Sequence, residues 1–369
     1  MAFERISPLT LDGLPKYLSF GYHRLIEHVV YTFVELNLAD RLVNAKSDQG
    51  MTVQEIIGDD SLNWNADMLY RILRSCVDAG IVEKVNDDKH FALTQSGRML
   101  TSDHPSHARD IFLYALEPLI TSAANQLPDI VRNQDTGSGI ARVTNGLNLY
   151  QFLSQPNQKH LSNIFSNAMT AISISSGKSL VKNVDFDRFT TLIDIGGGSG
   201  AYLAQILEHY PSIEHGIVLD LPHVINQTTN SEEFKSRMIP DDKYKFVIGN
   251  MFDSSTIPSA DAYILKNILH NYDDEKVVAI LSSIREASLS RIERHPVNVF
   301  IAEFIILPDG ALSNWQSHAL DIVMGFLCEG ARERTQEEFE KLLEKAGFKL
   351  KKVYPIQAPE SIIEAVLMN

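Results

Sequence analysis

The chain has 369 residues, and its 47 Asp and Glu against 33 Lys and Arg give a formal net charge of −14 at pH 7. A chain this long predicts about two or three domains with room for a sizeable core, which excludes a peptide hormone or a disulfide mini-domain. The negative charge repels polyanions, so nucleic acid and anionic membrane surfaces are disfavoured as main partners. A small neutral or cationic substrate fits better.

Two cysteines, Cys76 and Cys328, are too few and too far apart for a disulfide framework, and no Cys/His cluster has the spacing of a zinc site. We therefore expect a reducing compartment. The first residues lack the apolar run and cleavage site of a signal peptide. The longest apolar stretch, residues 297–307, falls short of the ~20 residues that span a bilayer. The sequence thus predicts a cytoplasmic protein without a membrane span.

The first hundred residues have the outline of a winged helix. Residues 14–42 place apolar side chains every three or four positions, as a helical packing surface does. Thr52 and Glu55 form a capping-box pattern that begins a short helix, and a second helix is expected from Asn65 to Gly80. Residues 81–85 and 91–94 flank a polar turn, which predicts a hairpin.

Winged helices often bind DNA, but charge opposes that function here. Residues 51–100 hold eight acidic and five basic side chains, a net charge of −3, and so lack the basic footprint of a DNA-binding domain. A module that packs against a partner, or against a second copy of itself, is favoured over a transcription regulator.

The rest of the chain divides into a helical part and an α/β part. Residues 105–185 are predicted to be helical, with a break in the Gly/Asn/Asp-rich stretch 133–146. After that, strands expected at 191–195, 216–219, 245–248, 262–265, 297–306, 349–354 and 362–367 alternate with helices. This alternation predicts a doubly wound, largely parallel sheet. The last two strands have no helix between them and should form a hairpin at one edge.

A glycine-rich turn follows the first of these strands. In the run 194–200, Asp-Ile-Gly-Gly-Gly-Ser-Gly, the glycines allow a tight turn and the close approach of a ligand. The Gly196-x-Gly198 spacing also satisfies a relaxed dinucleotide fingerprint, so a nicotinamide dehydrogenase and a simple tight turn remain alternatives. Asp194 suits the ammonium of an amino-acid-like ligand better than a pyrophosphate, and Asp220 is placed to bind ribose hydroxyls.

A candidate acid–base group follows the fourth strand. Ligands of an open parallel sheet bind beyond the carboxyl ends of the strands, so His270 lies on the functional edge. A neutral imidazole can accept a proton from a phenol-like hydroxyl, whose pKa is about 10 in water. Glu303 or Glu333 could hold the imidazole and stabilise the cation that forms. Alternatively, His270 caps a strand and the two glutamates form surface ion pairs.

These motifs, taken in order, resemble those of the S-adenosylmethionine-dependent small-molecule O-methyltransferases, the group of the plant caffeate and flavonoid enzymes and animal acetylserotonin methyltransferase. The resemblance covers nearly the whole chain. It implies an N-terminal all-α winged-helix dimerisation domain at 1–104 and a helical substrate-pocket region at 105–185. The remaining residues, 186–369, would form a class I methyltransferase domain with a doubly wound seven-stranded sheet.

The resemblance also assigns site residues. His270 would be the general base with Glu303 and Glu333 beside it, and no metal is needed. The glycine loop would pass under the methionyl part of the cofactor S-adenosylmethionine, and Met251 and Phe252 would flank its adenine. The implied cofactor-binding residues are Asp194, Gly196, Gly198, Gly200, Asp220, Leu221, Asn250, Met251, Phe252 and Lys266. The implied residues of the acceptor pocket are Met169, Met324 and Cys328.

The chain departs from the family pattern at a few positions, none of which removes the base or its carboxylates. Asn250 stands where the family usually has Asp near the adenine amino group, and its carbonyl can still accept that hydrogen bond. Asn271 and Tyr272 replace the Asp and Trp that commonly follow the catalytic His, and Ala331 replaces a glycine. Ile172 stands where some relatives carry a pocket His and makes that wall apolar.

The sequence therefore predicts methyl transfer to a hydroxyl of a small aromatic metabolite by a homodimer joined through its N-terminal domain. Transfer to an amine or a thiol is an alternative, since a thiol with a pKa near 8.5 needs little help from a base. A non-methylating binding protein built on the same fold is another.

Overall fold

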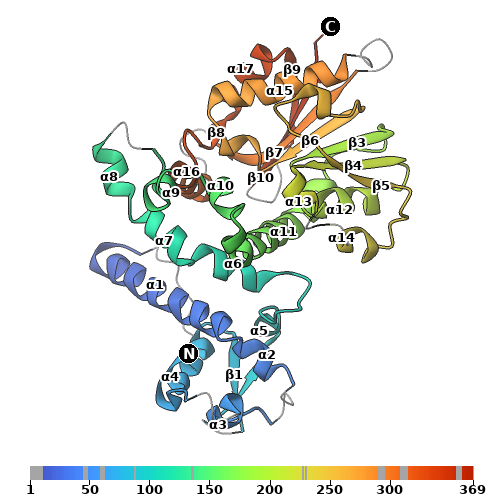
Figure 1. The fold of residues 1–369 in the computed structure, drawn as a ribbon. Helices are drawn as coiled ribbons and strands as arrows, with labels where there is room; N and C mark the ends of the chain where they lie inside the picture. Colours follow the sequence, from blue (N-terminus) through green and yellow to red (C-terminus); the bar gives the residue numbers. More distant parts are fainter. Residues whose placement is uncertain are drawn as a thin grey trace. The chain divides into compact units, whose positions relative to one another are not determined.

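The computed structural model of the chain describes residues 11–44, 49–58, 63–86, 89–133, 137–226, 228, 231–289, 296–307, 315–354 and 360–368. It divides into two compact units, Met1–Pro118 and Leu119–Asn369 (Figure 1). No helix in the described ranges is long and apolar enough to cross a membrane.

The N-terminal unit confirms the winged-helix outline, because its helices are accompanied by one two-stranded antiparallel hairpin. The capping box at Thr52 and Glu55 is present, and Asn65 caps the following helix by accepting from the Met68 amide at 3.0 Å. Its elements are α1 (Gly13–Glu35), α2 (Leu38–Leu42), α3 (Val53–Ile57), α4 (Ala66–Asp78), β1 (Val82–Val85), β2 (His90–Leu93), α5 (Gln95–Arg98) and α6 (Ala108–Ala115). Residues 87–88 of the predicted turn lie outside the described residues.

Helix α1 has two different halves. Val30, Phe33 and Val34, in its C-terminal half, are buried in the unit. Its N-terminal half exposes apolar side chains, namely Leu14, Tyr17, Leu18, Phe20, Tyr22 and Leu25. A helix end this apolar and this exposed has the character of a protein contact surface.

Helices precede the sheet in the second unit, as expected. The prediction that residues 133–146 interrupt these helices is wrong in part, because α9 (Gly139–Val143) forms within that stretch. Ser138 caps that helix by accepting from the Ala141 amide at 3.2 Å, and a side chain at Gly139 would stand 2.4 Å from the Ala123 carbonyl oxygen. The glycine therefore permits close helix packing here rather than a loop. The elements are α7 (Pro118–Ala124), α8 (Leu127–Arg132), α9 (Gly139–Val143), α10 (Leu149–Leu153), η3 (Pro156–Gln158) and α11 (Lys159–Val181).

The predicted sheet is confirmed, with strand order β5-β4-β3-β6-β7-β10-β9. The pairs from β5 to β7 are parallel, and β10 runs antiparallel to both of its neighbours, β7 and β9. Strands β9 and β10 form the expected edge hairpin. A two-residue strand, β8, adds to β7 outside this order. The strands are β3 (Thr191–Ile195), β4 (His215–Asp220), β5 (Tyr244–Ile248), β6 (Ala262–Lys266), β7 (Asn298–Ile306), β8 (Arg334–Thr335), β9 (Phe348–Tyr354) and β10 (Glu360–Leu367).

Helices cover both faces of this sheet and bury a core on each. One core packs strand side chains against α15 and α17, and the other packs them against α11 and α12, as Figure 1 shows. Strands β4 and β5 follow β3 on one side, whereas β6 and β7 lie on its other side, so the strand order reverses at β3 and β6 and their carboxyl ends form a topological switch point. The helices are α12 (Ala201–His209), α13 (Pro222–Ile225), α14 (Glu232–Lys235), η4 (Ser254–Thr256), η5 (Leu269–Asn271), α15 (Asp274–Ser288), α16 (Trp315–Leu327) and α17 (Gln336–Lys345).

Candidate active site

The glycine loop turns immediately beyond β3. Neighbouring side chains leave no room for a Cβ at two of its glycines, whereas a third borders open space. Gly196, Gly198 and Gly200 all have positive φ, between 57° and 79°, which L side chains rarely adopt. A Cβ at Gly196 would stand 2.6 Å from Ile268 Cδ1, and one at Gly200 would stand 2.6 Å from Phe234 Cε2. A Cβ at Gly198 would meet nothing within 4 Å. The open position at Gly198 is therefore where a ligand can approach the backbone.

Asp220 joins the end of β4 to this loop. Its Oδ2 accepts from the Gly198 amide at 2.9 Å and its Oδ1 from the Leu221 amide at 2.7 Å. Burial raises the pKa of Asp220, although these two amides oppose the rise. Each carboxylate oxygen keeps a second lone pair, so the predicted bonds to ribose hydroxyls remain available.

Asp194 and Lys266 form a buried charged layer under the loop. A Cβ at Gly197 would stand 2.7 Å from the Asp194 carboxylate, so that acid lies directly behind the turn. Burial raises the pKa of Asp194 to about 7, against the lowering effect of Lys266. Lys266 Nζ lies 3.6 Å from Glu360 Oε1 and has no hydrogen-bond partner among the described residues. Sequence reasoning missed Glu360, because it lies outside the strand expected at 362–367.

These features fit the cofactor that the resemblance implies. The buried carboxylates of Asp194 and Glu360 interact with the cation of Lys266, and the half-buried Asp220 acts on Asp194 and raises its pKa further. Such a site favours a ligand that carries positive charge, as a sulfonium and an ammonium do. The Lys266 ammonium group, which has no hydrogen-bond partner among the described residues, can in turn bond a carboxylate or another acceptor of the same ligand.

The residues predicted around the adenine lie after β4 and β5. Met251 Cε would be 3.6 Å from a Cβ at Gly196, so this side chain lies beside the glycine loop. Asn250 Oδ1 accepts from the Phe252 amide at 3.1 Å and so shapes its own turn. Leu221 and Phe252 are each 39% exposed, and the Phe252 ring meets Tyr272 edge-on at 5.4 Å between centroids. These exposed apolar groups can cover a flat ring.

His270 and Glu333 form a buried pair at the carboxyl end of β6. The imidazole Nδ1 lies 2.8 Å from Glu333 Oε1, and the two side chains are 7% and 0% exposed. Burial by itself lowers the pKa of His270, but the Glu333 hydrogen bond and the charges of Glu303 and Glu333 outweigh it, so that pKa is raised. The alternative of surface ion pairs is excluded by this burial.

Glu303 bonds different atoms from Glu333. The sequence left open which of the two carboxylates holds the imidazole, and their contacts differ. Its Oε1 accepts from the backbone amides of Ile268, Leu269 and His270 at 3.1, 2.6 and 3.2 Å. Glu303 therefore fixes the backbone of the His270 turn, whereas Glu333 holds the ring. Burial raises the pKa of Glu303 to about 7.

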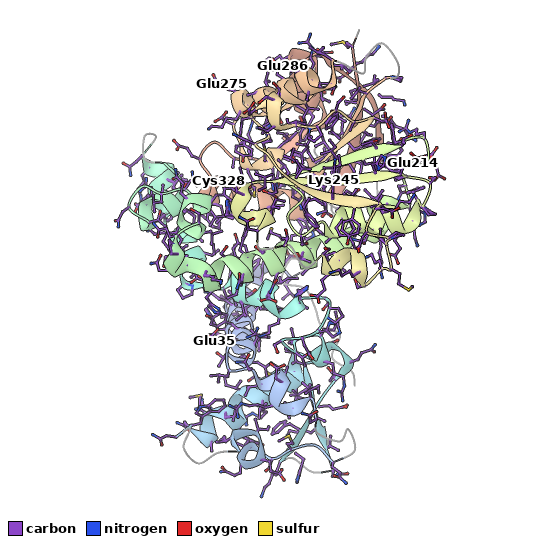
Figure 2. The ribbon with its side chains drawn as sticks, turned by 45° about the vertical axis from the view of Figure 1, so that its right-hand side comes forward. Glu35, Glu214, Lys245, Glu275, Glu286 and Cys328 are labelled. Carbon is purple, nitrogen blue, oxygen red and sulfur yellow. The ribbon has the colours of Figure 1, made fainter. Side chains whose placement is uncertain are left out.

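The residues predicted for the acceptor pocket lie on α11 and α16. Met169 is half-buried on α11, and Met324 is buried in the C-terminal half of α16. Cys328 is buried just beyond the end of α16 (Figure 2). Burial raises the pKa of the Cys328 thiol to about 12, so it is neutral. Thr170 Oγ1 lies 2.9 Å from Ser199 Oγ and ties α11 to the glycine loop. No sequence pattern relates these two hydroxyls, because 29 residues separate them.

Comparisons with known proteins match both parts of the chain. A model described as an O-methyltransferase domain matches residues 125–349, and one described as an O-methyltransferase dimerisation domain matches residues 20–103. Myricetin 7/4'-O-methyltransferase 2 of Solanum habrochaites is 30% identical, covering 90% of each chain. Desmethylxanthohumol 6'-O-methyltransferase of Humulus lupulus is 28% identical, covering 91% of this chain and 93% of that protein. The solved N,N-8-amino-8-demethyl-D-riboflavin dimethyltransferase of Streptomyces davawensis is 26% identical with a TM-score of 0.80, covering 97% and 100%.

Proposed function

The chain belongs to the S-adenosylmethionine-dependent O-methyltransferase family, and from that premise we propose that it methylates a hydroxyl of a small aromatic metabolite with His270 as the general base. The observation that carries this proposal is the buried imidazole held by Glu333 at the carboxyl end of β6. An imidazole fixed on one nitrogen presents the other to a ligand on the functional edge of the sheet.

The proposed division of the chain follows the sequence prediction. Residues 1–104 would dimerise, residues 105–185 would shape the acceptor pocket and residues 186–369 would bind the cofactor. S-adenosylmethionine supplies, when bound, a sulfonium methyl group that is already activated for transfer. The open backbone at Gly198, with Asp194, Asp220 and Lys266 around it, would hold that cofactor. The protein then has to orient the acceptor, exclude water and remove one proton.

His270 would remove that proton. A phenol has a pKa of about 10 in water, so a base beside the hydroxyl increases the share of the more nucleophilic oxyanion. The proton would move from the acceptor oxygen to Nε2 of His270. Nδ1–H donates to Glu333, whose negative charge stabilises the imidazolium. Glu303 would keep the His270 turn in place through its three backbone hydrogen bonds.

The surroundings support an aromatic acceptor. Met169, Ile172, Met324 and the neutral thiol of Cys328 offer apolar, polarizable walls. The names of two related enzymes give O-methylation of myricetin and desmethylxanthohumol as their activities. An acceptor with a flat apolar ring and a hydroxyl is the class that we assign to this chain.

The dimerisation domain implies a homodimer. We assign the contact to the exposed apolar half of α1, which includes Leu14, Leu18 and Leu25 at 69, 51 and 61% exposure. Covering such a surface with a second copy would remove a large apolar area from water.

The test of the catalytic proposal compares His270→Gln with a matched control, His160→Gln, whose side chain lies exposed on α11. Both proteins are incubated with methyl-labelled cofactor and a panel of catechols, flavonols and simple phenols, and methylated products are counted by mass spectrometry. His270→Gln should lose roughly 10²–10⁴ in turnover, the usual value of general-base catalysis. Its cofactor affinity, measured by calorimetry, should match that of the control. Undiminished turnover in His270→Gln would contradict the assigned role.

A second candidate acceptor is an aromatic amine. The observation that favours it is the similarity to the dimethyltransferase of an aminoriboflavin over nearly the whole chain. An aryl amine carries its lone pair without prior deprotonation, so it depends less on a base. Arylamine methylation that survives in His270→Gln would select this acceptor class over the hydroxyl.

A further inference from the structure

Arg334 lies in the two-residue strand β8, next to Glu333 in the chain, and its side chain is completely buried. We propose that Arg334 is a positioning residue, which holds the His270 turn and the Glu333 segment at the separation that the reaction needs. The inference rests on the proposed function of His270 as the base. Arg334 itself cannot touch a substrate, because none of its surface is exposed.

The guanidinium uses every one of its five N–H donors. Nε and Nη2 donate to Asp274 Oδ1 at 3.0 and 2.9 Å. Nη2 also donates to the Tyr272 carbonyl oxygen at 2.7 Å. Nη1 donates to the carbonyl oxygens of Leu269 and Arg332 at 3.2 and 3.4 Å. A buried charge satisfied this completely is costly to replace, since any smaller donor leaves backbone carbonyls unpaired.

These acceptors belong to the two segments that carry the proposed base and its carboxylate. Leu269 and Tyr272 flank His270, and Arg332 precedes Glu333. The Arg332 amide also donates to the His270 carbonyl oxygen at 3.0 Å. Arg334 thus joins the two segments through buried hydrogen bonds. The hydrogen bond between His270 and Glu333 connects the same two segments.

The His270 turn is held from two sides. Glu303 on β7 accepts the amides of residues 268–270, while Arg334 donates to the carbonyls of Leu269 and Tyr272. Arg334 is itself paired with Ile305 of β7, two residues after Glu303. Strand β7, which carries Glu303, therefore also fixes the position of Arg334. Both sets of hydrogen bonds thus attach the His270 turn to the same strand.

Weakening the hydrogen bonds of Arg334 should change the pH at which His270 titrates. The charged groups that face this imidazole are Glu333 before β8, Glu303 on β7 and Lys266 on β6. Burial lowers the pKa of His270, and the Glu333 hydrogen bond is the strongest of the effects that raise it. A longer or intermittent Glu333 contact weakens the largest effect that raises this pKa, so the titration midpoint moves to lower pH.

The experiment follows the imidazole in the full-length protein labelled with ¹³C at histidine Cε1, with the His270 signal assigned by its loss in His270→Gln. Arg334→Lys keeps a positive charge but has three donors on a flexible stem, so it cannot reproduce the planar five-donor fork. Its midpoint should move to lower pH, while its affinity for S-adenosylmethionine by calorimetry stays within about twofold of wild type, as for a change remote from that ligand. With a phenolic acceptor, kcat should fall by roughly 10–100-fold, the cost of a small misplacement of a reacting group.

Arg332→Lys is the matched control. Its guanidinium is 41% exposed and pairs with Asp274 and Glu338, and the backbone amide that meets His270 is retained. The control should keep the wild-type midpoint. If Arg334→Lys does not fold, Asp274→Asn, in the first turn of α15 and 45% exposed, should give a smaller shift in the same direction.

Three results would overturn the inference. One is a wild-type midpoint in Arg334→Lys or, where that variant does not fold, in Asp274→Asn. Another is an equal shift in Arg332→Lys, and the last is a loss of cofactor affinity that parallels the loss of turnover. Failure of the proposed function would instead appear as undiminished turnover in His270→Gln, which does not depend on the titration midpoint.

Discussion

The substitution Glu333→Gln isolates the charge of the carboxylate that holds His270. The amide is nearly isosteric with the acid, and its oxygen can still accept from Nδ1, which lies 2.8 Å from the present Oε1. What disappears is the negative charge beside the imidazolium that would form, in the proposed reaction, when His270 takes the proton of the acceptor. The substitution should therefore slow turnover without changing the affinity for the cofactor.

The size of the effect follows from the geometry. Two unit charges about 4 Å apart interact by ~4 kcal/mol at an effective dielectric constant of about 20. A neutral acceptor keeps about half of the strength of a charge-assisted hydrogen bond. The remaining loss of about 2 kcal/mol corresponds to a fall in kcat of roughly 30-fold. Because the Glu333 bond opposes the effect of burial on the pKa of His270, its weakening should also move the rising limb of the pH–rate profile to lower pH.

Initial rates are measured from pH 5 to 9 with the phenol that the wild-type enzyme methylates fastest. Glu329→Gln serves as the control, since it removes an exposed carboxylate from the same segment. If Glu333→Gln matched the control in kcat and in its pH profile, the charge would not stabilise a transferred proton, and His270 would have to act without its carboxylate.

Three further expectations concern the cofactor site, stability and assembly. Asp220→Ala removes the acceptor of the Gly198 and Leu221 amides, and should weaken S-adenosylmethionine binding about tenfold or more in calorimetry; unchanged affinity would separate this acid from the site. The pKa of Asp194 is raised from 3.8 to about 7 by burial, so its share of stability is present below pH 4 and is lost as pH rises through 7. Asp194→Asn should therefore gain up to about 4 kcal/mol over wild type between pH 4 and 8 in urea unfolding, and parallel curves would refute the raised pKa. Replacing Leu18 with Glu should convert the dimer to a monomer in light scattering at micromolar concentration, whereas a persisting dimer would place the contact elsewhere.

The sheet was predictable because its signals are local. Strands buried on both faces are continuous apolar runs, and the helices between them begin at recognisable caps, as Asp273 caps α15. The capping box at Thr52 and Glu55 is local in the same way. The one wrong prediction, a break across α9, concerns Gly139. There the glycine serves close packing against Ala123, and only the tertiary structure distinguishes that use from a turn.

The candidate site was predictable as a set of residues but not as a set of partners. Switch-point topology places His270 and the glycine loop on one edge from sequence alone. The same argument could not say which of Glu303 and Glu333 bonds the His270 ring and which bonds the backbone of its turn. One lies on a strand and the other in a loop, and they reach the turn from different directions. Glu360 and Thr170 were missed for a related reason. Their partners, Lys266 and Ser199, lie far away in sequence, and no periodicity connects them.

The arrangement separates two electrostatic tasks on neighbouring strands. Beyond β3 and β4, an excess of carboxylate over ammonium favours a cationic cofactor and disfavours the neutral product state of that site. Beyond β6 and β7, buried glutamates raise the pKa of the imidazole and so favour the protonated form that the proposed proton transfer would produce. Lys266, at the end of β6, lies between the two and limits how far each set of acids acts on the other, since it lowers the pKa of both Asp194 and His270. In the proposed reaction the methyl group would leave the sulfonium with the bonding pair remaining on sulfur and bond to the acceptor oxygen, whose proton would pass to His270. The cofactor site would thereby lose a positive charge, and the His270 site would gain one that Glu333 and Glu303 stabilise.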